Sequence, residues 1–182
     1  MILPIYLYGH PVLRKKSIDI DKDYPNLDQI IDNMFETMYK ADGIGLAAPQ
    51  IGLNINLITI DGRPLAKDEP EMTDFKRVFI NPKITFNTKE TIAIEEGCLS
   101  IPGINEGVNR IDDLTIEYYD ENFKKVKENL SGYRAIVIQH EYDHLQGIMF
   151  VDKISPIRKR FIKGKLNNIT KGKVVTSYKV KK

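Results

Sequence analysis

The sequence contains little cysteine and no long apolar run, and each absence narrows the class of protein. With Cys98 as the only cysteine, no disulfide bond can form within the chain. No stretch reaches the roughly 20 apolar residues that a membrane-spanning helix needs. Residues 1–13 lack the basic start and apolar run of a secretion signal. We therefore expect a cytoplasmic protein with no membrane partner, stabilised by an ordinary hydrophobic core.

Length and composition predict a single globular domain. The chain has 182 residues, of which 42% are hydrophobic and 29% are charged, a profile that excludes disordered and fibrous proteins. A chain of this length can bury one continuous core and is short for two. We expect a single domain over residues 1–182, with room for one active site.

Acidic residues are missing from the last part of the chain. Residues 153–182 hold eleven Lys and Arg and no Asp or Glu, while residues 1–152 hold the other sixteen cations and all twenty-five acids. The net charge of +2 therefore divides into +11 on a basic C-terminal helix or tail and −9 on the rest. Such a segment either binds phosphates without regard to sequence or is a solvated helix face that only aids solubility.

Hydrophobic spacing predicts one helix followed by a set of strands. Apolar residues at steps of three and four indicate an amphipathic helix over residues 27–38, which Asp42-Gly43 ends. Residues 61–76, with two prolines and many charges, are interpreted as a solvated loop. Four short strands and the returning strand of a hairpin are expected at residues 55–60, 78–80, 91–94, 114–119 and 124–130.

Two more helices are expected after the strands. One runs from residue 131 or 132 to 145, with Gly147 just past its end. Its apolar residues lie on two sides, so we expect the helix to be buried and its polar residues to have partners inside the protein. The other begins at Ser155-Pro156, with Ser as cap and Pro as first helical residue, and ends near residue 171.

The first of these two helices carries an HExxH motif at residues 140–144. Residues four apart share a helix face, so His140 and His144 can bind one ion while Glu141 reaches a water beside it. Five-residue patterns also occur by chance, and the alternative is a helix with incidental histidines. His10, the third histidine, has no companion at ligand spacing and is interpreted as a surface or turn residue.

Two histidines do not complete a catalytic metal site, which normally has three protein ligands and one open position. The residues after His144 contain no further histidine, and Cys98 is the natural candidate for the third ligand. It follows Gly97, which lets the backbone come close to a ligand. The alternative is a buried structural thiol, as most lone cysteines are, and the HExxH motif favours the ligand.

Residues 43–50, with the sequence GIGLAAPQ, are rich in glycine and small apolar residues. Their glycines let a peptide main chain approach and pair with this segment as an added strand. The alternative is a Gly-rich turn that joins a helix to a strand.

Residues 43–50, 96–100 (EGCLS) and 139–144 (QHEYDH) together resemble, in this order, the three motifs of the peptide deformylase family. These enzymes remove the N-formyl group from nascent bacterial proteins. The resemblance spans the chain and implies an α+β fold, with antiparallel β-sheets packed around the HExxH helix and with an N-terminal and a C-terminal helix. It also implies one divalent ion on Cys98, His140 and His144, with Fe²⁺ expected and Zn²⁺, Ni²⁺ or Co²⁺ accepted.

The same resemblance implies the chemistry. A water on the ion attacks the formyl carbon, while Glu141 takes its proton and delivers it to the leaving amine. The side-chain amide of Gln50 and the backbone N–H of Leu99 meet the charge that develops on the formyl oxygen.

The resemblance further implies how the substrate, N-formylmethionine of a nascent polypeptide, is bound. Backbone groups of Ile44, Gly45 and Gly97 hold the peptide as a short strand. Ile136 and Val137, one turn before the first histidine, are the walls that contact the methionine side chain.

Four charged or polar positions lie in or near the motifs. Glu96 and Asp143 either support the ligands through hydrogen bonds or are simply charges of a helix or loop. Arg110 stands where many relatives have an arginine, but Asn105 or a neighbour replaces an arginine that some relatives carry nearer the cysteine. The sequence therefore leaves open whether a charged side chain binds the end of the peptide that lies farthest from the formyl group.

Two other functions stay open on the sequence alone. The first is an HExxH peptidase that cuts internal peptide bonds, which the thiolate ligand and the short chain disfavour. The second is a ribosome-associated binding module whose metal is structural, which is disfavoured because structural sites usually have four protein ligands. The C-terminal segment of the family is a ribosome contact, so docking of the basic segment on the ribosome is a further expectation.

Overall fold

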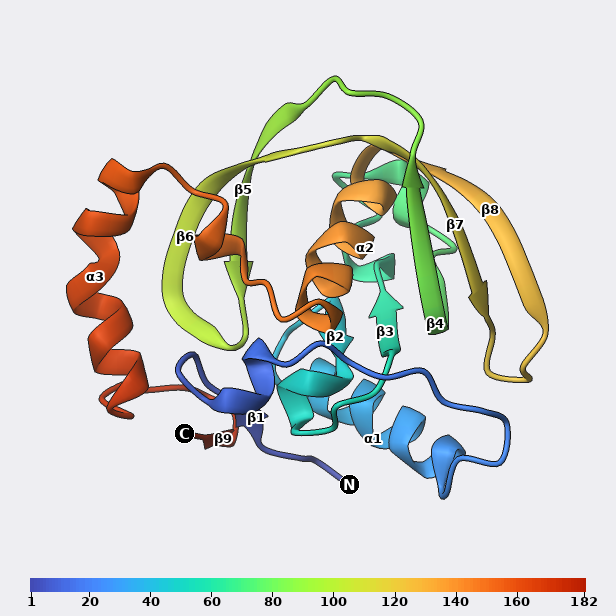
Figure 1. The fold of residues 1–182 in the computed structure, drawn as a ribbon, viewed down its shortest axis with the longest axis horizontal. Helices are drawn as coiled ribbons and strands as arrows, with labels where there is room; N and C mark the ends of the chain where they lie inside the picture. The colour runs from blue at the N-terminus through green and yellow to red at the C-terminus, as the bar shows by residue number, and fades with distance from the viewer.

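Five antiparallel strands form the main sheet, in the order β2-β3-β4-β7-β8 (Figure 1). The structure is a computed structural model that describes residues 1–182. A second, antiparallel sheet pairs β5 with β6, and β1 pairs with β9 in parallel. The strands are β1 (Ile5–Tyr6), β2 (Gly45–Ala47), β3 (Leu57–Asp61), β4 (Lys76–Phe86), β5 (Ile92–Cys98), β6 (Ile101–Arg110), β7 (Asp113–Tyr119), β8 (Lys125–Ser131) and β9 (Val180–Lys181).

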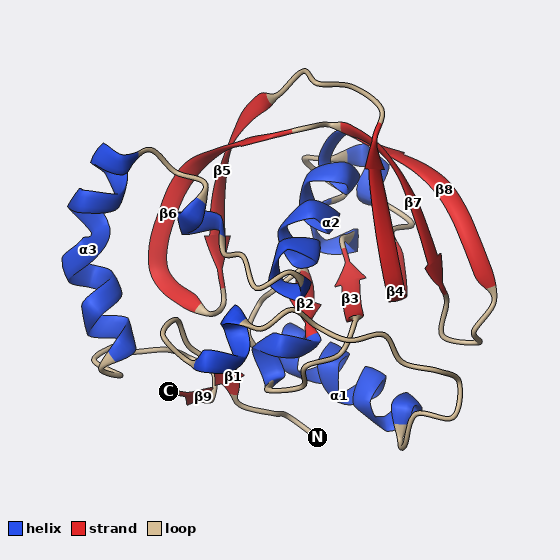
Figure 2. Cartoon of the chain, viewed as in Figure 1, coloured by secondary structure: helices blue, strands red, loops and turns tan.

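Three α-helices accompany the sheets, as the α+β prediction requires. Helix α2 lies between β5 and β6 on one side and β4, β7 and β8 on the other, whereas α3 lies outside β6 (Figure 2). The helices are α1 (Leu27–Lys40), α2 (Gly132–Leu145) and α3 (Pro156–Thr170). Short 3-10 turns are η1 (Pro11–Arg14), η2 (Ala48–Ile51), η3 (Arg63–Leu65), η4 (Pro70–Met72) and η5 (Phe150–Asp152).

The HExxH helix is buried on two sides, as its apolar pattern predicts. Ala135, Ile138 and Leu145 are fully buried against the main sheet, where they pack with Ile58 and Phe79. Burying an isoleucine or leucine side chain contributes about 1.5 to 3 kcal/mol. The position of α2 is therefore fixed by its packing, and so are the polar side chains that it carries.

The ends of α1 and α3 follow the local signals of the sequence. Asp42 adopts a left-handed conformation, with φ of 55°, just after α1. The Ser155 hydroxyl accepts a hydrogen bond from the Arg158 N–H at 3.3 Å at the start of α3, which satisfies one of the free donors of a helix N-terminus. His10 is a turn residue as expected, because its Nδ1 accepts from the Val12 N–H at the start of η1.

The sequence prediction is wrong for residues 61–76 and incomplete for the strands. Residues 61–76 are not simply a solvated loop, because they include η3 and η4 and because Met72 and Phe75 are fully buried. Strand β6 was not expected, and β4 extends well beyond residues 78–80. Prolines in residues 61–76 start 3-10 turns there and do not keep the segment in solvent.

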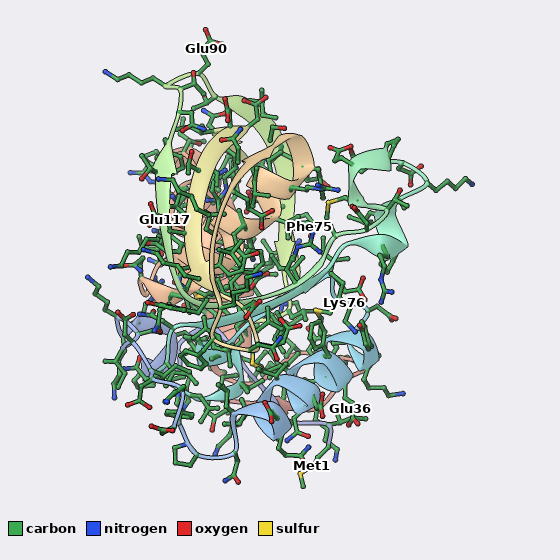
Figure 3. The ribbon with its side chains drawn as sticks, turned by 90° about the vertical axis from the view of Figure 1, so that its right-hand side faces the viewer. Met1, Glu36, Phe75, Lys76, Glu90 and Glu117 are labelled. Carbon is green, nitrogen blue, oxygen red and sulfur yellow. The ribbon has the colours of Figure 1, made fainter.

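Both chain ends lie on the same side of the molecule. Figure 3 shows Met1 and Glu36 at the end opposite Glu90, which marks the connection between β4 and β5. After α3 the chain returns to the N-terminal segment, where Val180 pairs with Ile5. The basic C-terminal segment thus packs back onto the fold.

Candidate active site

Helix α2 and the end of β5 bring three potential metal ligands together. His140 and His144 lie one turn apart on α2, with ring centroids separated by 5.1 Å. The Sγ of Cys98 lies 3.3 Å from Nε2 of His144. One donor atom from each of the three residues can be chosen so that all lie within 4.8 Å of one another. The structure therefore assembles the three residues that the sequence proposed as ligands.

This donor set fits a divalent metal ion. Bonds from such an ion to Cys sulfur and His nitrogen are about 2.0 to 2.3 Å long, so the three donor atoms are close enough to surround one ion. The imidazole of His140 uses its Nδ1 to contact Oε2 of Glu96 at 2.8 Å, which leaves Nε2 for the ion. A carboxylate behind a ligand histidine is a usual support of metal sites.

A buried ion-pair network stands behind the ligands. Arg110, with 2% of its side chain exposed, donates to both carboxylate oxygens of Glu96, at 2.6 and 2.9 Å, and to Asp143 at 2.6 Å. Burial by itself raises the pKa of Glu96, but the hydrogen bonds from Arg110 and His140 outweigh it and lower the pKa to about 2. Glu96 and Asp143 are thus buried partners of Arg110, which connects the two motifs that carry the ligands.

The carboxyl group of Glu141 is buried beside the ligands. Its Oε2 has no hydrogen-bond partner within the protein, and burial raises its pKa to about 7. A Cβ atom at Gly45 would overlap this carboxylate, so a larger residue at that position on β2 would have to displace the side chain of Glu141. A carboxyl group with a pKa near neutral pH can both accept and release a proton.

Gln50 and Leu99 flank the cysteine. The side chain of Gln50 is held by its Oε1, which accepts from the Ala47 N–H at 2.8 Å. Its Nε2 points to Sγ of Cys98 at 3.6 Å and to the Ser100 hydroxyl at 3.3 Å. The N–H of Leu99 donates to no acceptor of the protein. Two N–H groups therefore lie close to the ligand cluster, and that of Leu99 has no acceptor in the protein.

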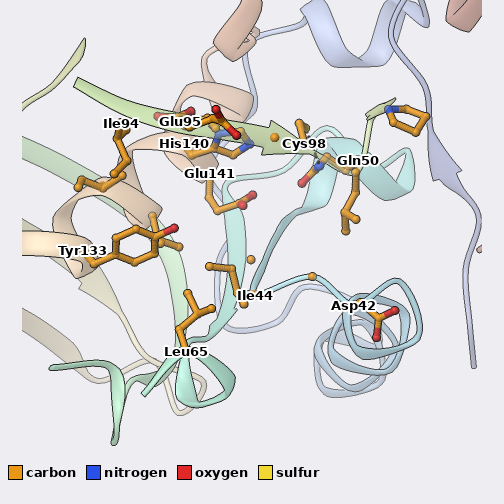
Figure 4. A pocket seen from close by; sticks show the side chains of 18 of the residues that line it. Asp42, Ile44, Gln50, Leu65, Ile94, Glu95, Cys98, Tyr133, His140 and Glu141 are labelled. Atoms are coloured by element: carbon orange, nitrogen blue, oxygen red, sulfur yellow. Dashed lines mark hydrogen bonds and ion pairs between the residues drawn. The ribbon is translucent and has the colours of Figure 1, made fainter. Parts of the chain in front are cut away.

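These residues open into a cavity of about 450 Å³. Figure 4 shows Gln50, Cys98 and Glu141 close together in it, with Tyr133 and Leu65 farther along. Apart from His144, which is buried and does not line the cavity, the predicted site residues line it: Ile44, Gly45, Gln50, Gly97, Cys98, Leu99, Ile136, Val137, His140 and Glu141.

Sequence reasoning missed several residues of the cavity. Leu65 comes from the segment that was expected to be a solvated loop, and Tyr178 comes from the basic C-terminal segment. Tyr133 lies on the HExxH helix α2 but outside the motif. None of the three lies in a motif, so no local signal could have identified Leu65 or Tyr178.

Comparison with known proteins supports the family resemblance. The family model for polypeptide deformylase matches residues 2–160. The peptide deformylase of Christiangramia forsetii is 54% identical, over 100% of this chain and 96% of its own length. The peptide deformylase of Thermotoga maritima superposes with a TM-score of 0.77 at 38% identity, over 86% of this chain and 99% of its own.

A plant structure agrees equally well. Arabidopsis thaliana peptide deformylase 1B, in complex with an inhibitor, superposes with a TM-score of 0.82 at 36% identity, over 94% of this chain and 92% of its own. No helix of the present fold combines the length and the apolar character that crossing a membrane requires. The chain belongs to the peptide deformylase family, a family of metalloenzymes that remove a formyl group.

Proposed function

We propose that this chain, as a single catalytic domain over residues 1–182, hydrolyses the N-formyl group from N-formylmethionine at the start of nascent polypeptides. The observation that carries the proposal is the arrangement of the donor atoms of Cys98, His140 and His144, within 4.8 Å of one another and beside the buried carboxylate of Glu141. Formate and a free N-terminal amine are the products of this hydrolysis.

The three ligands are proposed to hold one divalent ion, with Fe²⁺ as the physiological metal. A thiolate and two imidazoles suit Zn²⁺, Ni²⁺ and Co²⁺ as well. When bound, the ion supplies a Lewis acid that polarises a carbonyl group and lowers the pKa of water. Glu96 and Arg110 keep the imidazole of His140 oriented toward the ion through the hydrogen bonds described above.

Glu141 is proposed to move the proton. Its carboxylate is free of partners on Oε2 and lies against Gly45, so it can take a proton from the attacking water and give it to the departing amine. A pKa of about 7 places the group between its two protonation states at neutral pH.

Gln50 and Leu99 are proposed to bind the oxygen on which negative charge develops. The Nε2 of Gln50 and the N–H of Leu99 both lie next to Cys98. Fixed donors of this kind act most strongly in the transition state, and losing one typically costs about 3 kcal/mol.

The cavity is proposed to take the first residues of the peptide. β2 and β5 are each paired on one edge only, so backbone groups of Ile44, Gly45 and Gly97 are placed to hold an added strand. Ile136 and Val137 are largely buried, and both line the cavity, so they offer apolar walls to the methionine side chain.

Turnover of matched peptides tests the proposal. The metal-loaded protein is expected to release formate from formyl-Met-Ala-Ser and to leave the unformylated peptide and its internal bonds intact. Removal of the metal with a chelator is expected to abolish the release, and re-addition of Fe²⁺ under anaerobic conditions to restore it. Cleavage of the internal bonds would instead indicate a peptidase, and formate release that survives complete metal removal would contradict the metal-dependent proposal.

We also propose that the protein works in the cytoplasm and docks on the ribosome through α3. Arg160, Lys163 and Lys165 are exposed on this helix and form no ion pair. Changing these three to Glu is expected to reduce co-sedimentation with ribosomes and to flatten its salt dependence, because phosphates attract cations regardless of sequence.

A matched charge reversal controls for net charge. Lys67, Lys89 and Lys124 are exposed on other parts of the surface and likewise form no ion pair. Their change to Glu is expected to leave co-sedimentation largely intact. Equal loss in both triple variants would show that only overall charge matters, and the docking proposal would then fail.

A further inference from the structure

The segment after α3 contributes a side chain to the active-site cavity. We call residues 171–182 the C-terminal strap. Tyr178 of the strap lines the cavity, and its hydroxyl donates to the backbone carbonyl oxygen of Leu99 at 2.8 Å. Tyr178 lies outside residues 2–160, the part of the chain that matches the family model. The contact therefore involves a residue that lies outside the three motifs of the family.

The strap is anchored to the N-terminal segment directly after Tyr178. The N–H of Ile5 donates to the carbonyl oxygen of Lys179 at 2.9 Å, and the N–H of Leu7 donates to that of Lys181 at 2.8 Å. Figure 1 shows β1 and β9 side by side below the sheets. These hydrogen bonds fix the backbone from which the tyrosine extends.

The same N-terminal segment holds the next peptide group of the cysteine turn. The N–H of Tyr8 donates to the carbonyl oxygen of Ser100 at 2.8 Å. Two consecutive carbonyl groups, those of Leu99 and Ser100, are thus held by Tyr178 and Tyr8, which come from the two paired ends of the chain. Residues far apart in sequence converge on one turn.

This turn lies between β5 and β6, where the register shifts after Gly97. The side chain of Leu99 lies against Gly43, where an added Cβ would come within 2.8 Å of it. Leu99 is therefore held on its side chain by Gly43 and on its carbonyl group by Tyr178, while its N–H remains without a protein acceptor. Only the N–H is left free to bind a substrate.

We propose that Tyr178 is a positioning residue, through which the C-terminal strap fixes Leu99 so that its N–H faces the formyl oxygen of the substrate. This inference rests on the proposed deformylase function. The hydroxyl acts through the peptide backbone of Leu99, whereas the ion is held by other residues. Removal of the Tyr178 hydroxyl is expected to destabilise the transition state more than it weakens the binding of substrate, because charge on the formyl oxygen develops only as the reaction proceeds.

Replacing Tyr178 with Phe tests the inference, because the ring remains and only the hydroxyl is lost. We expect kcat for formyl-Met-Ala-Ser to fall about tenfold, KM to stay within about twofold, and metal content to remain unchanged. We also expect faster hydrogen–deuterium exchange in a peptide covering residues 97–101, because the turn is held by one hydrogen bond fewer.

Tyr118 provides the matched control. Its hydroxyl donates to Glu128 at 2.7 Å on β7 and β8, away from the cavity. The Tyr118→Phe variant loses a hydrogen bond of the same kind and is expected to keep kcat and the exchange of residues 97–101 at wild-type values.

The outcomes separate this inference from the proposed function. The inference fails if Tyr178→Phe keeps kcat within twofold, if only KM changes, or if exchange in residues 97–101 is the same as in Tyr118→Phe. A wild-type protein that releases no formate would refute the proposed function and, with it, the role of Tyr178 in that reaction. The exchange comparison would still show whether Tyr178 holds the turn.

Discussion

Replacing Glu141 with Gln is expected to lower kcat/KM for formyl-Met-Ala-Ser by roughly 10³-fold or more, at unchanged metal content. Gln has nearly the shape of Glu, so it fits in the space that Gly45 leaves, but it cannot accept a proton from water. The metal is retained because the side chain is not among the three clustered donors. Steady-state kinetics and metal analysis on the same preparation measure both quantities.

Two variants sharpen this test. Glu141→Ala is expected to be equally inactive. Because Ala also lacks the carboxylate but brings no amide into the site, equal loss in both variants shows that the missing proton carrier, and not the new amide, is the cause. Glu117→Gln removes a partly exposed carboxylate on β7, outside the cavity, and is expected to leave kcat/KM unchanged. Glu141→Gln with more than a tenth of wild-type activity would refute the role of Glu141 as the base. Loss of the metal in that variant would point to a role in binding the ion.

The ligand cluster could be predicted from sequence because most of its geometry is local. An α-helix places residues four apart on one face, so the pairing of His140 and His144 follows from the helix alone. The burial of α2 likewise follows from apolar residues on two of its sides. The approach of Cys98 depends on the tertiary fold, and it could be expected only by comparing the three motifs with a known family.

Strand β6 shows why other parts could not be predicted. Its residues alternate between buried and exposed positions, as in any half-buried strand. Two of the buried positions hold Glu106 and Arg110, and the strand also contains two glycines and a proline. Hydrophobicity therefore does not alternate along the sequence. The charged residues can be buried because Arg158 pairs with Glu106 and because Glu96 and Asp143 pair with Arg110, contacts that span 14 to 52 residues.

The cavity residues that were missed have the same origin. Leu65 and Tyr178 belong to segments whose composition indicates solvent exposure, and both reach the cavity only because distant parts of the chain hold them there. For Tyr178 these parts are the N-terminal strand and the turn after Cys98. Contacts at such separations leave no periodic pattern in a single sequence.

Replacing Arg110 with Met is expected to lower the free energy of unfolding by about 3 to 5 kcal/mol at pH 7, because it leaves two buried carboxylates without their cation. Glu96 and Asp143 are both largely buried. Glu96 would retain only His140, and Asp143 would retain only Lys153, at 3.2 Å. Weaker support of the His140 imidazole is also expected to lower metal affinity about 10- to 100-fold. Urea unfolding of the metal-free protein and metal titration measure the two effects separately.

The pH dependence of this loss identifies its cause. The pKa of Glu96 is about 2 in the folded protein and near 4.5 in the unfolded chain. The wild-type network therefore contributes its full stability above about pH 4.5 and loses it as the pH falls toward 2. Without Arg110 the carboxyl group of Glu96 is more easily protonated, so the difference in unfolding free energy between variant and wild type is expected to shrink as the pH falls from 7 toward 4.

Arg134→Met is the matched control. It removes an ion pair whose partner, Asp74, is 76% exposed, and should cost about 1 kcal/mol or less at either pH. If Arg110→Met unfolds at the same urea concentration as Arg134→Met, the buried network does not stabilise the site, and the orientation of His140 must come from the packing of α2 alone.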